Sequence, residues 1–324
     1  MQTGWAFPRL GRRASCRPAA GSPRILVVGW QQEEAVAHAM GCLAPEAAVT
    51  FLPALTAARR FHTREQLLEA FAAHDAVFLT LSLPALRDGL AAADLRGSPR
   101  IALVPPIWFW AFHPDQVRVG PYDRPIQGPL GDLHSGLVLL GFLRGWPPAT
   151  VLKLFDARVF ARVGFFQAWD ESMQYMRAAA SISGLDLEAS VARWMRQGCF
   201  MHSASHIKTR VAVDLARDLL RRTGLSCEFC NLEEFLASDP GRGESWPVYP
   251  ELADHFGIPG SALFLRAASR RAAARSVMTL PAFIAESFAA YARVAPRVLV
   301  CPKVERWQAD AALSADLDRL VLGV

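Results

Sequence analysis

The chain has 324 residues, of which 52% are hydrophobic and 20% are charged, and its formal net charge is +5 at pH 7. This composition supports a large buried core and excludes a disordered chain. No apolar run reaches the roughly 18 to 20 residues that span a bilayer. The arginines are spread along the chain and do not form the basic stripe of a nucleic-acid-binding protein.

The first residues and the cysteines indicate where the protein works. Residues 1–23 are rich in arginine, lack acidic residues and contain no apolar segment, so we predict a disordered tail and no secretory signal. The six cysteines are scattered without a disulfide framework, which favours a reducing, cytoplasmic compartment. Cys227 and Cys230 form a CxxC without the context of a redox pair or a zinc site, and we interpret them as ordinary thiols.

Strands alternate with helices in the first part of the chain. The apolar run at residues 24–29 predicts a buried strand, and residues 31–42 follow with helical spacing. Thr63 and Gln66 form a capping box at the start of another helix. This alternation predicts right-handed βαβ units and a parallel sheet. Its further strands are expected at residues 49–55, 75–83 and 100–104. Ligands of such sheets bind beyond the carboxyl ends of the strands.

The pattern becomes helical from about residue 130. Helices are expected at residues 133–143, 149–155, 160–180, 186–197, 281–293 and 308–321. Another begins at Ser205 or His206 and ends just before Gly224, which is placed as its C′ residue. We therefore predict an α/β protein. A parallel-sheet, Rossmann-like half (residues 24–125) packs against a mostly α-helical half (residues 126–324) in a single domain.

Standard catalytic signatures are missing from the sequence. It has no GxGxxG after the first strand, no P-loop, no GxSxG and no HExxH. Its polar chemistry is gathered instead in three histidine-bearing segments, at residues 113–115, 131–135 and 202–206. These segments are the candidate functional residues.

The first two segments each allow two interpretations. His113 and Asp115 are either an imidazole with its orienting carboxylate or a loop in which Asp115 caps the backbone and His113 packs on tryptophans. Asp132 is a good helix N-cap, which would place His134 in the first turn beside free backbone N–H groups that favour an anion. A cap and a functional histidine are compatible there.

The third segment holds two histidines four residues apart, His202 and His206, with serines between them and Lys208 after them. A helical pair of this spacing can bind a metal, but no carboxylate or third histidine lies nearby, so we expect no metal. A general-base histidine with an anion-binding lysine at a helix start is the better chemical interpretation.

Several motifs in order, from about residue 24 to residue 265, resemble the WcbI-like family of polysaccharide-biosynthesis (capsular polysaccharide) acetyltransferases. The motifs are FHPD at 112–115, GPLGDLHS at 128–135, Phe155, GFF at 164–166, WD at 169–170, RW at 193–194, GCFMH at 198–202, His206 and WPVYPE at 246–251. The resemblance implies a coenzyme A-binding protein that acetylates a sugar hydroxyl during capsular or extracellular polysaccharide assembly.

The sequence departs from the family pattern at two places. Where the family carries Gly-Asn-Cys-Gln after the first strand, this chain has Gly29, Trp30, Gln31 and Gln32, so the cysteine position holds Gln31. The family's His-Pro-Lys is His206-Ile207-Lys208 here.

Acyl transfer from a thioester needs no covalent enzyme intermediate, so a histidine base and an oxyanion site suffice. We expect His134 or His202 to be the base and Asp132 to orient a histidine. Gln32 with the backbone N–H groups of residues 29–31 would form the oxyanion site.

The expected ligands are coenzyme A or acetyl-coenzyme A and a sugar or polysaccharide acceptor, with no nucleic acid. Lys208 and neighbouring arginines would meet the phosphates of coenzyme A. His113, His206, Gly29 and Gln31 complete the predicted coenzyme A site.

Two other functions remain open on the sequence. One is a glycan esterase with Ser135 or Ser82 as nucleophile, although adjacent helical residues such as His134 and Ser135 point in different directions. The other is a non-catalytic relative that binds coenzyme A or a glycan, which the altered run at residues 29–32 favours.

Overall fold

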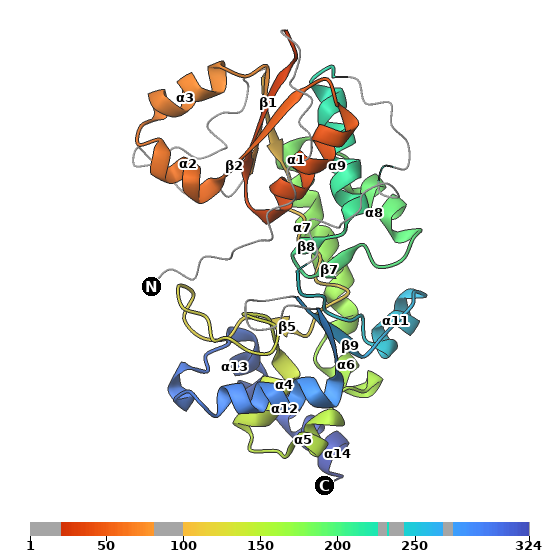
Figure 1. The fold of residues 1–324 in the computed structure, drawn as a ribbon. Coiled ribbons are helices and arrows are strands. Elements are labelled where there is room, and N and C mark those ends of the chain that lie inside the picture. The colour runs from red at the N-terminus through yellow and green to blue at the C-terminus, as the bar shows by residue number, and fades with distance from the viewer. Residues whose placement is uncertain (1–20, 81–99, 226–231, 233–242, 268–274, 324) are drawn as a thin grey trace. The chain divides into compact units, whose positions relative to one another are not determined.

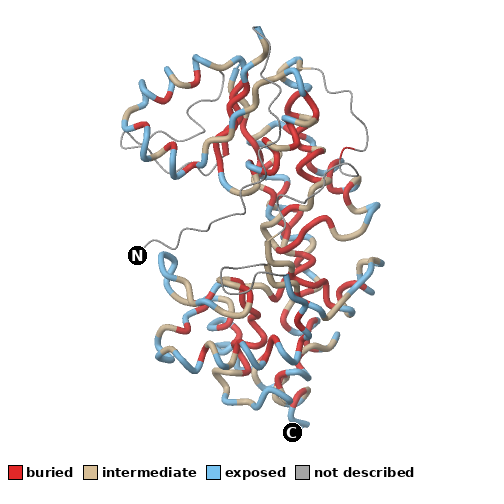
Figure 2. The backbone as a smooth tube through the Cα atoms, in the orientation of Figure 1, coloured by how far each residue is buried: buried red, intermediate tan, exposed pale blue. Residues whose placement is uncertain are grey.

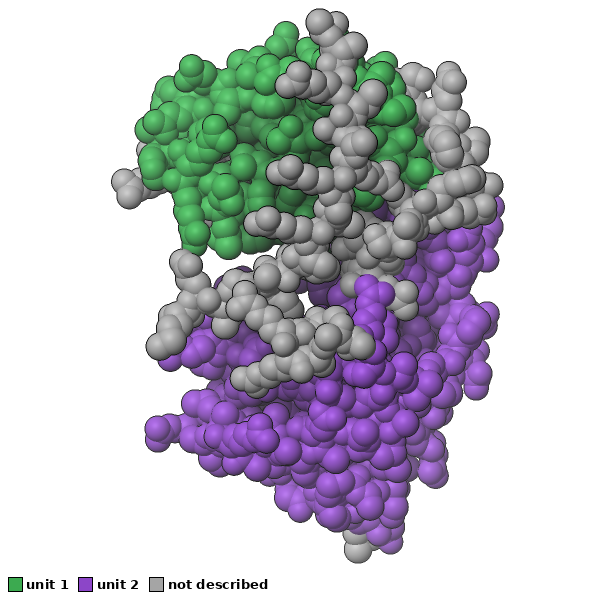
Figure 3. Space-filling view, viewed as in Figure 1, with its two compact units in different colours: residues 1–104, 215–235 green, residues 105–214, 236–324 purple. Residues whose placement is uncertain are grey.

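The computed structural model describes residues 21–80, 100–225, 232, 243–267 and 275–323, which divide into two compact units (Figures 1 and 3). Unit 1 comprises residues 1–104 and 215–235, and unit 2 comprises residues 105–214 and 236–324. We expected the sheet-bearing half to end near residue 125, whereas unit 1 ends at residue 104 and takes in a later segment. The predictions for residues 1–20, Ser82, Cys227 and Cys230 lie outside the described residues.

Unit 1 is built on a four-stranded parallel sheet with the order β2-β1-β3-β4. Its strands are β1 (Arg24–Gly29), β2 (Ala48–Pro53), β3 (Ala76–Thr80) and β4 (Ile101–Val104). The central strands β1 and β3 are buried along almost their whole length (Figure 2). They carry apolar side chains on both faces, as strands of a parallel sheet covered on both sides do. The predicted parallel sheet is confirmed.

Helices cover the sheet of unit 1. They are α1 (Gln31–Leu43), α2 (Ala54–Arg60) and α3 (Arg64–Ala72). Phe61, Leu67 and Phe71 pack with Leu26 and Val28 in one core cluster. At the start of α3 the Thr63 hydroxyl accepts the backbone N–H of Gln66, as the capping box predicts. The Gln66 side chain instead accepts from the N–H of His62.

Unit 2 is mainly helical. Its helices are α4 (Gly136–Leu143), α5 (Pro148–Leu152), α6 (Ala157–Arg162), α7 (Ala168–Ser183), α8 (Leu187–Met195), α11 (Pro250–Phe256), α12 (Leu280–Tyr291), α13 (Pro302–Ala309) and α14 (Ala311–Leu322). Two short 3₁₀ helices, Phe165–Gln167 and Pro296–Val298, lie between them. Its interior is rich in aromatic rings; Phe264 and Phe283, for example, stack with ring centroids 4.2 Å apart.

Three two-stranded antiparallel ribbons join the helices of unit 2. They are β5 (Gln116–Val117) with β6 (His134–Ser135), β7 (Met201–Ser203) with β8 (His206–Ile207), and β9 (Leu263–Arg266) with β10 (Ser276–Thr279). Helix α9 (Thr209–Arg222) follows β8, and the unit boundary falls within it. The predicted fold class, a parallel-sheet part followed by a mainly helical part, is confirmed.

Two predicted helices of unit 2 are interrupted in the structure. The segment at 160–180 contains the end of α6, a 3₁₀ turn that follows Gly164 in the left-handed conformation (φ 80°), and α7. The segment at 308–321 contains the end of α13 and most of α14, because the Asp310 carboxylate caps α14 by accepting the Leu313 N–H at 3.0 Å. Among the described residues, no helix is long and apolar enough to cross a membrane.

Candidate functional site

Helix α4 begins later than predicted. We expected Asp132 to be its N-cap and His134 to lie in its first turn, but Ser135 is the N-cap, and its hydroxyl accepts the Val138 N–H at 3.0 Å. His134 lies in the short strand β6, paired with Val117. Asp132 instead forms an ion pair with Arg118 at 3.0 Å, in which the Arg118 side chain is 62% exposed.

A buried carboxylate explains this choice of cap. Asp115 is fully buried, and its carboxylate accepts the Leu137 N–H at 2.9 Å and the Tyr249 hydroxyl at 3.0 Å. Burial raises the pKa of Asp115, whereas hydrogen bonds from Ser135, Leu137 and Tyr249 oppose the rise. Asp115 therefore caps the backbone, as the second interpretation of the first segment predicted, and holds no hydrogen bond to His113.

His134 is locked in place by two hydrogen bonds. Its Nε2 lies 2.8 Å from the carbonyl oxygen of Ile126, and its Nδ1 lies 3.0 Å from the Tyr291 hydroxyl. Burial lowers the pKa of His134, so the ring is neutral at pH 7. The carbonyl can only accept, so Nε2 carries the proton and Nδ1 accepts from Tyr291. This arrangement leaves no ring nitrogen of His134 to act on a substrate.

The third segment forms a hairpin where we expected a helix start. Strands β7 and β8 pair around a turn at Ala204, and α9 begins only at Thr209. Across this turn the Ser203 hydroxyl lies 2.6 Å from Nδ1 of His206. On the sequence, Ser203 is only a cap-like serine between the two histidines, so its bond to His206 could not be predicted from the spacing.

The tautomer of His206 follows from the burial of Ser203. Ser203 has no exposed surface, and His206 Nδ1 is the one acceptor within reach of its hydroxyl proton among the described residues. The hydroxyl therefore donates to Nδ1, and the remaining ring nitrogen of His206, Nε2, carries a proton. No described group accepts that proton, and Nε2 is not sealed from solvent.

Charged groups surround His206. Burial lowers its pKa to about 4, and the nearby His202 and Arg118 add to this effect, while Asp132 opposes it. His206 is therefore a neutral donor at pH 7. The second and third histidine segments thus contribute Asp132, His202 and His206 to one cluster within unit 2.

His202 and His113 complete the cluster. His202 lies in β7 with 7% of its surface exposed, and its carbonyl oxygen accepts the Trp246 N–H at 2.7 Å. His113 is buried, and burial with the nearby Lys208 cation lowers its pKa to about 3. Neither ring nitrogen of His113 has a hydrogen bond of normal geometry among the described residues, and the Trp246 backbone contributes only a weaker polar contact.

Lys208 is engaged with the protein backbone. Its Nζ donates to the carbonyl oxygen of Cys199 at 2.7 Å, and the Arg210 guanidinium donates to the same carbonyl at 2.9 Å. These bonds hold the turn between α8 and β7. The predicted role of Lys208 toward phosphates stays a prediction, and Arg118 is the more exposed cation of the cluster.

The predicted oxyanion site at residues 29–32 belongs to unit 1, and one of its backbone N–H groups is already hydrogen-bonded within the protein. Glu33, in the first turn of α1, is 2% exposed, and its carboxylate accepts the Trp30 N–H at 2.8 Å. Its side chain also fills the place where a Cβ on Gly29 would lie. The Trp30 N–H is therefore unavailable to an oxyanion, which corrects that part of the prediction, while the roles of Gly29, Gln31 and Gln32 remain predictions.

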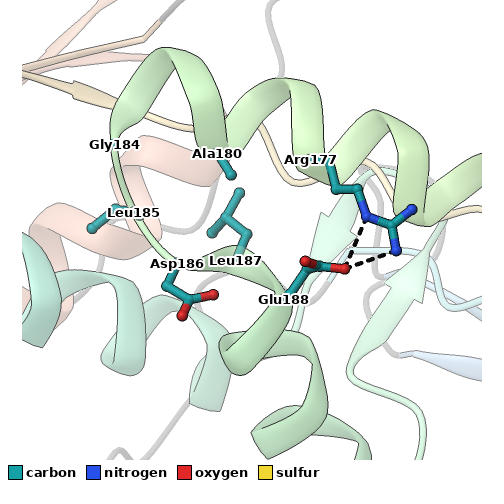
Figure 4. Close-up of a pocket in the computed structure, with 7 residues that line it drawn as sticks. All are labelled: Arg177, Ala180, Gly184, Leu185, Asp186, Leu187 and Glu188. Atoms are coloured by element: carbon teal, nitrogen blue, oxygen red, sulfur yellow. Dashed lines mark hydrogen bonds and ion pairs between the residues drawn. The ribbon is translucent and has the colours of Figure 1, made fainter.

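Other candidate sites among the described residues would be a metal site or a pocket outside the histidine cluster. In the part of the chain that the structure describes, no three histidine, cysteine or acidic side chains gather as metal ligands. A hollow of about 390 Å³ lies between the end of α7 and the start of α8, walled by the ion pair of Arg177 with Glu188 (Figure 4). None of the predicted site residues lines this hollow.

The fold and the site together define an α/β protein with a Rossmann-like parallel sheet and a helical unit that carries a cluster of histidine side chains. The family model described as polysaccharide biosynthesis enzyme WcbI matches residues 24–228. The chain therefore belongs to the WcbI family of polysaccharide biosynthesis enzymes, and the predicted family is confirmed.

A solved structure supports the same fold. It is described as WcbI, a novel polysaccharide biosynthesis enzyme, in its native form without a disulfide bond between coenzyme A and a cysteine. The two chains are 14% identical with a TM-score of 0.63, and the match covers 92% of this chain and 99% of that one. None of the curated proteins matches this chain.

Proposed function

We propose that this protein is a coenzyme A-dependent O-acetyltransferase that acts on a sugar hydroxyl in capsular or extracellular polysaccharide biosynthesis. Membership of the WcbI family supports the pathway, and the description of the solved WcbI structure names coenzyme A as a molecule associated with that enzyme. The single observation that carries the proposal is the Ser203–His206 hydrogen bond, because it makes His206 Nε2 a fixed donor beside a second imidazole.

The cluster supplies the two functions that acyl transfer needs. His202 takes the proton of the sugar hydroxyl, whose oxygen then attacks the thioester carbonyl carbon. His206 Nε2–H donates to the carbonyl oxygen as negative charge develops on it. The carbon–sulfur bond then breaks, the sugar keeps the acetyl group, and the coenzyme A sulfur takes up the proton that His202 received from the hydroxyl, which returns His202 to its starting state.

The remaining residues position these groups. His134 is assigned to the scaffold, because Tyr291 and Ile126 occupy its ring nitrogens. Asp132 favours the charged form of both His134 and His206, which steadies the cluster as charge develops. Arg118, with its exposed guanidinium, is the cation best placed to meet a phosphate of coenzyme A.

Calorimetry of the full chain with coenzyme A and with acetyl-coenzyme A tests the binding half of the proposal. We expect both ligands to bind. If neither coenzyme A nor acetyl-coenzyme A binds, the proposed acetyltransferase function is refuted. Transfer of a radiolabelled acetyl group to polysaccharide fragments tests the chemistry. His202→Ala should lower kcat by about 10²- to 10⁴-fold, the usual contribution of a general base.

A matched control is His62→Ala, since His62 is an exposed histidine outside the cluster. It should transfer at the wild-type rate. Full transfer by His202→Ala would overturn the assignment of the base. Binding of coenzyme A without turnover on any acceptor would instead favour a non-catalytic relative.

A glycan esterase is the second candidate, and the Ser203–His206 hydrogen bond favours it over the serines that we first considered. Ser135 is excluded as its nucleophile, because its hydroxyl caps α4 and bonds Asp115. Ser82 lies outside the described residues. Rapid covalent labelling of Ser203 by a serine-reactive phosphonate would select the esterase, and we expect none because Ser203 is fully buried.

A further inference from the structure

An aromatic cluster lies on the surface of unit 2, outside the imidazole cluster. Trp108 and Trp110 come from the segment after β4, and Tyr175 comes from α7. The Tyr175 ring lies 6.0 Å from the Trp108 ring and 5.9 Å from the Trp110 ring, measured between centroids. We call these three residues the aromatic platform.

The platform exposes a large aromatic ring that the core does not need. Trp108 is 54% exposed, whereas its neighbours Phe109 and Phe112 are fully buried. In this segment Phe109 and Ala111 are buried, whereas Trp108 is exposed and Trp110 is half-buried. A single exposed ring is common on protein surfaces, but an exposed Trp108 ring with two further aromatic rings grouped around it favours a binding role.

A carboxylate stands at the edge of the platform. The Trp110 Nε1–H donates to Glu171 Oε2 at 3.3 Å. Glu171 precedes Tyr175 by one helical turn on α7, so both side chains lie on the same helix face. Partial burial raises the pKa of Tyr175, which keeps its hydroxyl neutral and able to donate.

These groups fit a pyranose ring better than other ligands. The face of an aromatic ring is electron-rich and attracts the polarised C–H bonds on the face of a sugar ring. A carboxylate and a phenol at the rim offer an acceptor and a donor for its hydroxyls. An anionic ligand such as a nucleotide phosphate would meet the Glu171 charge and be disfavoured.

A direct backbone contact joins the platform segment to the imidazole cluster. The N–H of Phe109, the residue between the two tryptophans, donates to the carbonyl oxygen of Ala204 at 2.9 Å. Ala204 is in the β7–β8 turn, between Ser203 and His206. The chain that carries the platform is thus bonded to the turn that carries the donor histidine, within one compact unit.

We propose that Trp108, Trp110 and Tyr175 form a pyranose-stacking subsite that holds the acceptor glycan next to the β7–β8 turn. As an acceptor subsite it rests on the proposed acetyltransferase function. Glu171 orients the stacked sugar through its hydroxyls. Stacking recognises the face of the ring, and the hydrogen bonds of Glu171 to the sugar hydroxyls decide which pyranose binds best.

The test measures binding of maltohexaose, cellohexaose and chitohexaose to the full chain by saturation-transfer NMR and by tryptophan fluorescence. We expect at least one of the three to bind, with contacts from sugar C–H protons. Trp108→Ala should weaken that binding by about tenfold or more, and Trp108→Phe should recover most of it. Glu171→Gln should change which oligosaccharide binds best.

Tyr122→Ala is the matched control, because Tyr122 is an aromatic residue of unit 2 that is 93% exposed and lies outside the platform. It should leave binding unchanged. Absence of binding by all three oligosaccharides, or equal losses in Trp108→Ala and Tyr122→Ala, would overturn the subsite.

Coenzyme A calorimetry on the same variants separates this inference from the proposed function. Trp108→Ala should bind coenzyme A as the wild type does, which also shows that the variant is folded. Glycan binding without any coenzyme A binding would refute the acetyltransferase and leave the platform as a glycan site. If the wild type binds coenzyme A and transfers acetyl groups, and Trp108→Ala does both equally well, the aromatic platform is refuted as an acceptor subsite and the acetyltransferase function stands.

Discussion

The hydroxyl of Ser203 donates to Nδ1 of His206 across the β7–β8 turn at 2.6 Å, and Ser203 has no exposed surface. A buried hydroxyl with one partner fixes the tautomer of that partner, so His206 presents Nε2–H. With a pKa of about 4, the ring stays neutral at pH 7 and can serve as a donor without gaining or losing a proton.

Removing this hydroxyl should disturb the donor without unfolding the protein. In Ser203→Ala the tautomer of His206 is no longer fixed, so we expect kcat for acetyl transfer to fall by about tenfold or more. The coenzyme A Kd should hold. The ¹⁵N chemical shifts of the His206 ring report the tautomer directly and should move toward a mixed population. Ser181→Ala, a surface serine of α7, is the control. Unchanged ring shifts in Ser203→Ala would contradict the assignment.

Acid should destabilise the protein through its buried neutral histidines. The folded pKa of His113, about 3, lies below the 6.5 of an ordinary histidine, so between these values the unfolded chain binds more protons than the folded one. The free energy of unfolding therefore falls as the pH falls through this window. At pH 5 the loss from His113 is about 2 kcal/mol.

Urea unfolding at pH 7.5 and pH 5 measures this loss. His113→Phe keeps an aromatic ring and removes the titration, so its stability should fall less between the two pH values than that of the wild type. Replacing the exposed His62 with Phe is the control and should leave the pH dependence unchanged. Parallel losses in the wild type and His113→Phe would show that His113 is not a buried neutral group.

Asp115 should matter to stability more than any surface carboxylate. Asp115→Ala leaves the Leu137 N–H and the Tyr249 hydroxyl without their buried acceptor and removes the negative charge beside Lys303. We expect a loss of about 3 to 5 kcal/mol in the free energy of unfolding. Asp123→Ala, at an exposed position in the same part of the chain, should cost under about 0.5 kcal/mol. A small loss in Asp115→Ala would mean that other groups replace the acceptor.

The strands and the family motifs could be predicted from the sequence because their signals are local. The apolar run of β1 and the capping box at Thr63 each lie within a few residues. The start of α4 could not be predicted, since Asp132 and Ser135 are both good caps. Asp115, 22 residues away from Leu137, decides between them.

The β7–β8 hairpin at Ser203 could not be predicted either, because it too depends on residues distant in the chain. Its register depends on bonds to distant residues, such as that from Phe109 N–H to the Ala204 carbonyl. The sequence predicts the histidines as a group of candidate residues. Their separate roles, His206 as a donor and His134 as part of the scaffold, depend on hydrogen-bond partners, some of which are distant in the chain. Tyr291, which bonds His134, lies 157 residues from it.

Arg118 should contribute to coenzyme A binding and little to stability. Its side chain is 62% exposed in the ion pair with Asp132, and exposed pairs stabilise proteins by at most about 1 kcal/mol. In Arg118→Ala we expect the coenzyme A Kd to rise by about tenfold and the thermal midpoint to hold. The binding should also weaken with added salt in the wild type and less so in the variant. Arg124→Ala, an exposed arginine nearby in the sequence, is the control, and equal effects of both substitutions would refute a specific contact.

Gly128 should be required for the position of His134. A Cβ at residue 128 would lie 2.7 Å from Cε1 and 3.0 Å from Nδ1 of the His134 ring, and this ring is held by Tyr291 and Ile126 and cannot give way. Gly128→Ala should therefore displace the ring and lower the free energy of unfolding by about 1 to 3 kcal/mol. Gly243→Ala is the matched control, because a Cβ there meets nothing within 4 Å. Urea unfolding measures both variants, and the His134 ring shifts should move only in Gly128→Ala. If Gly128→Ala is as stable as Gly243→Ala, His134 is not clamped and regains its candidacy as the general base.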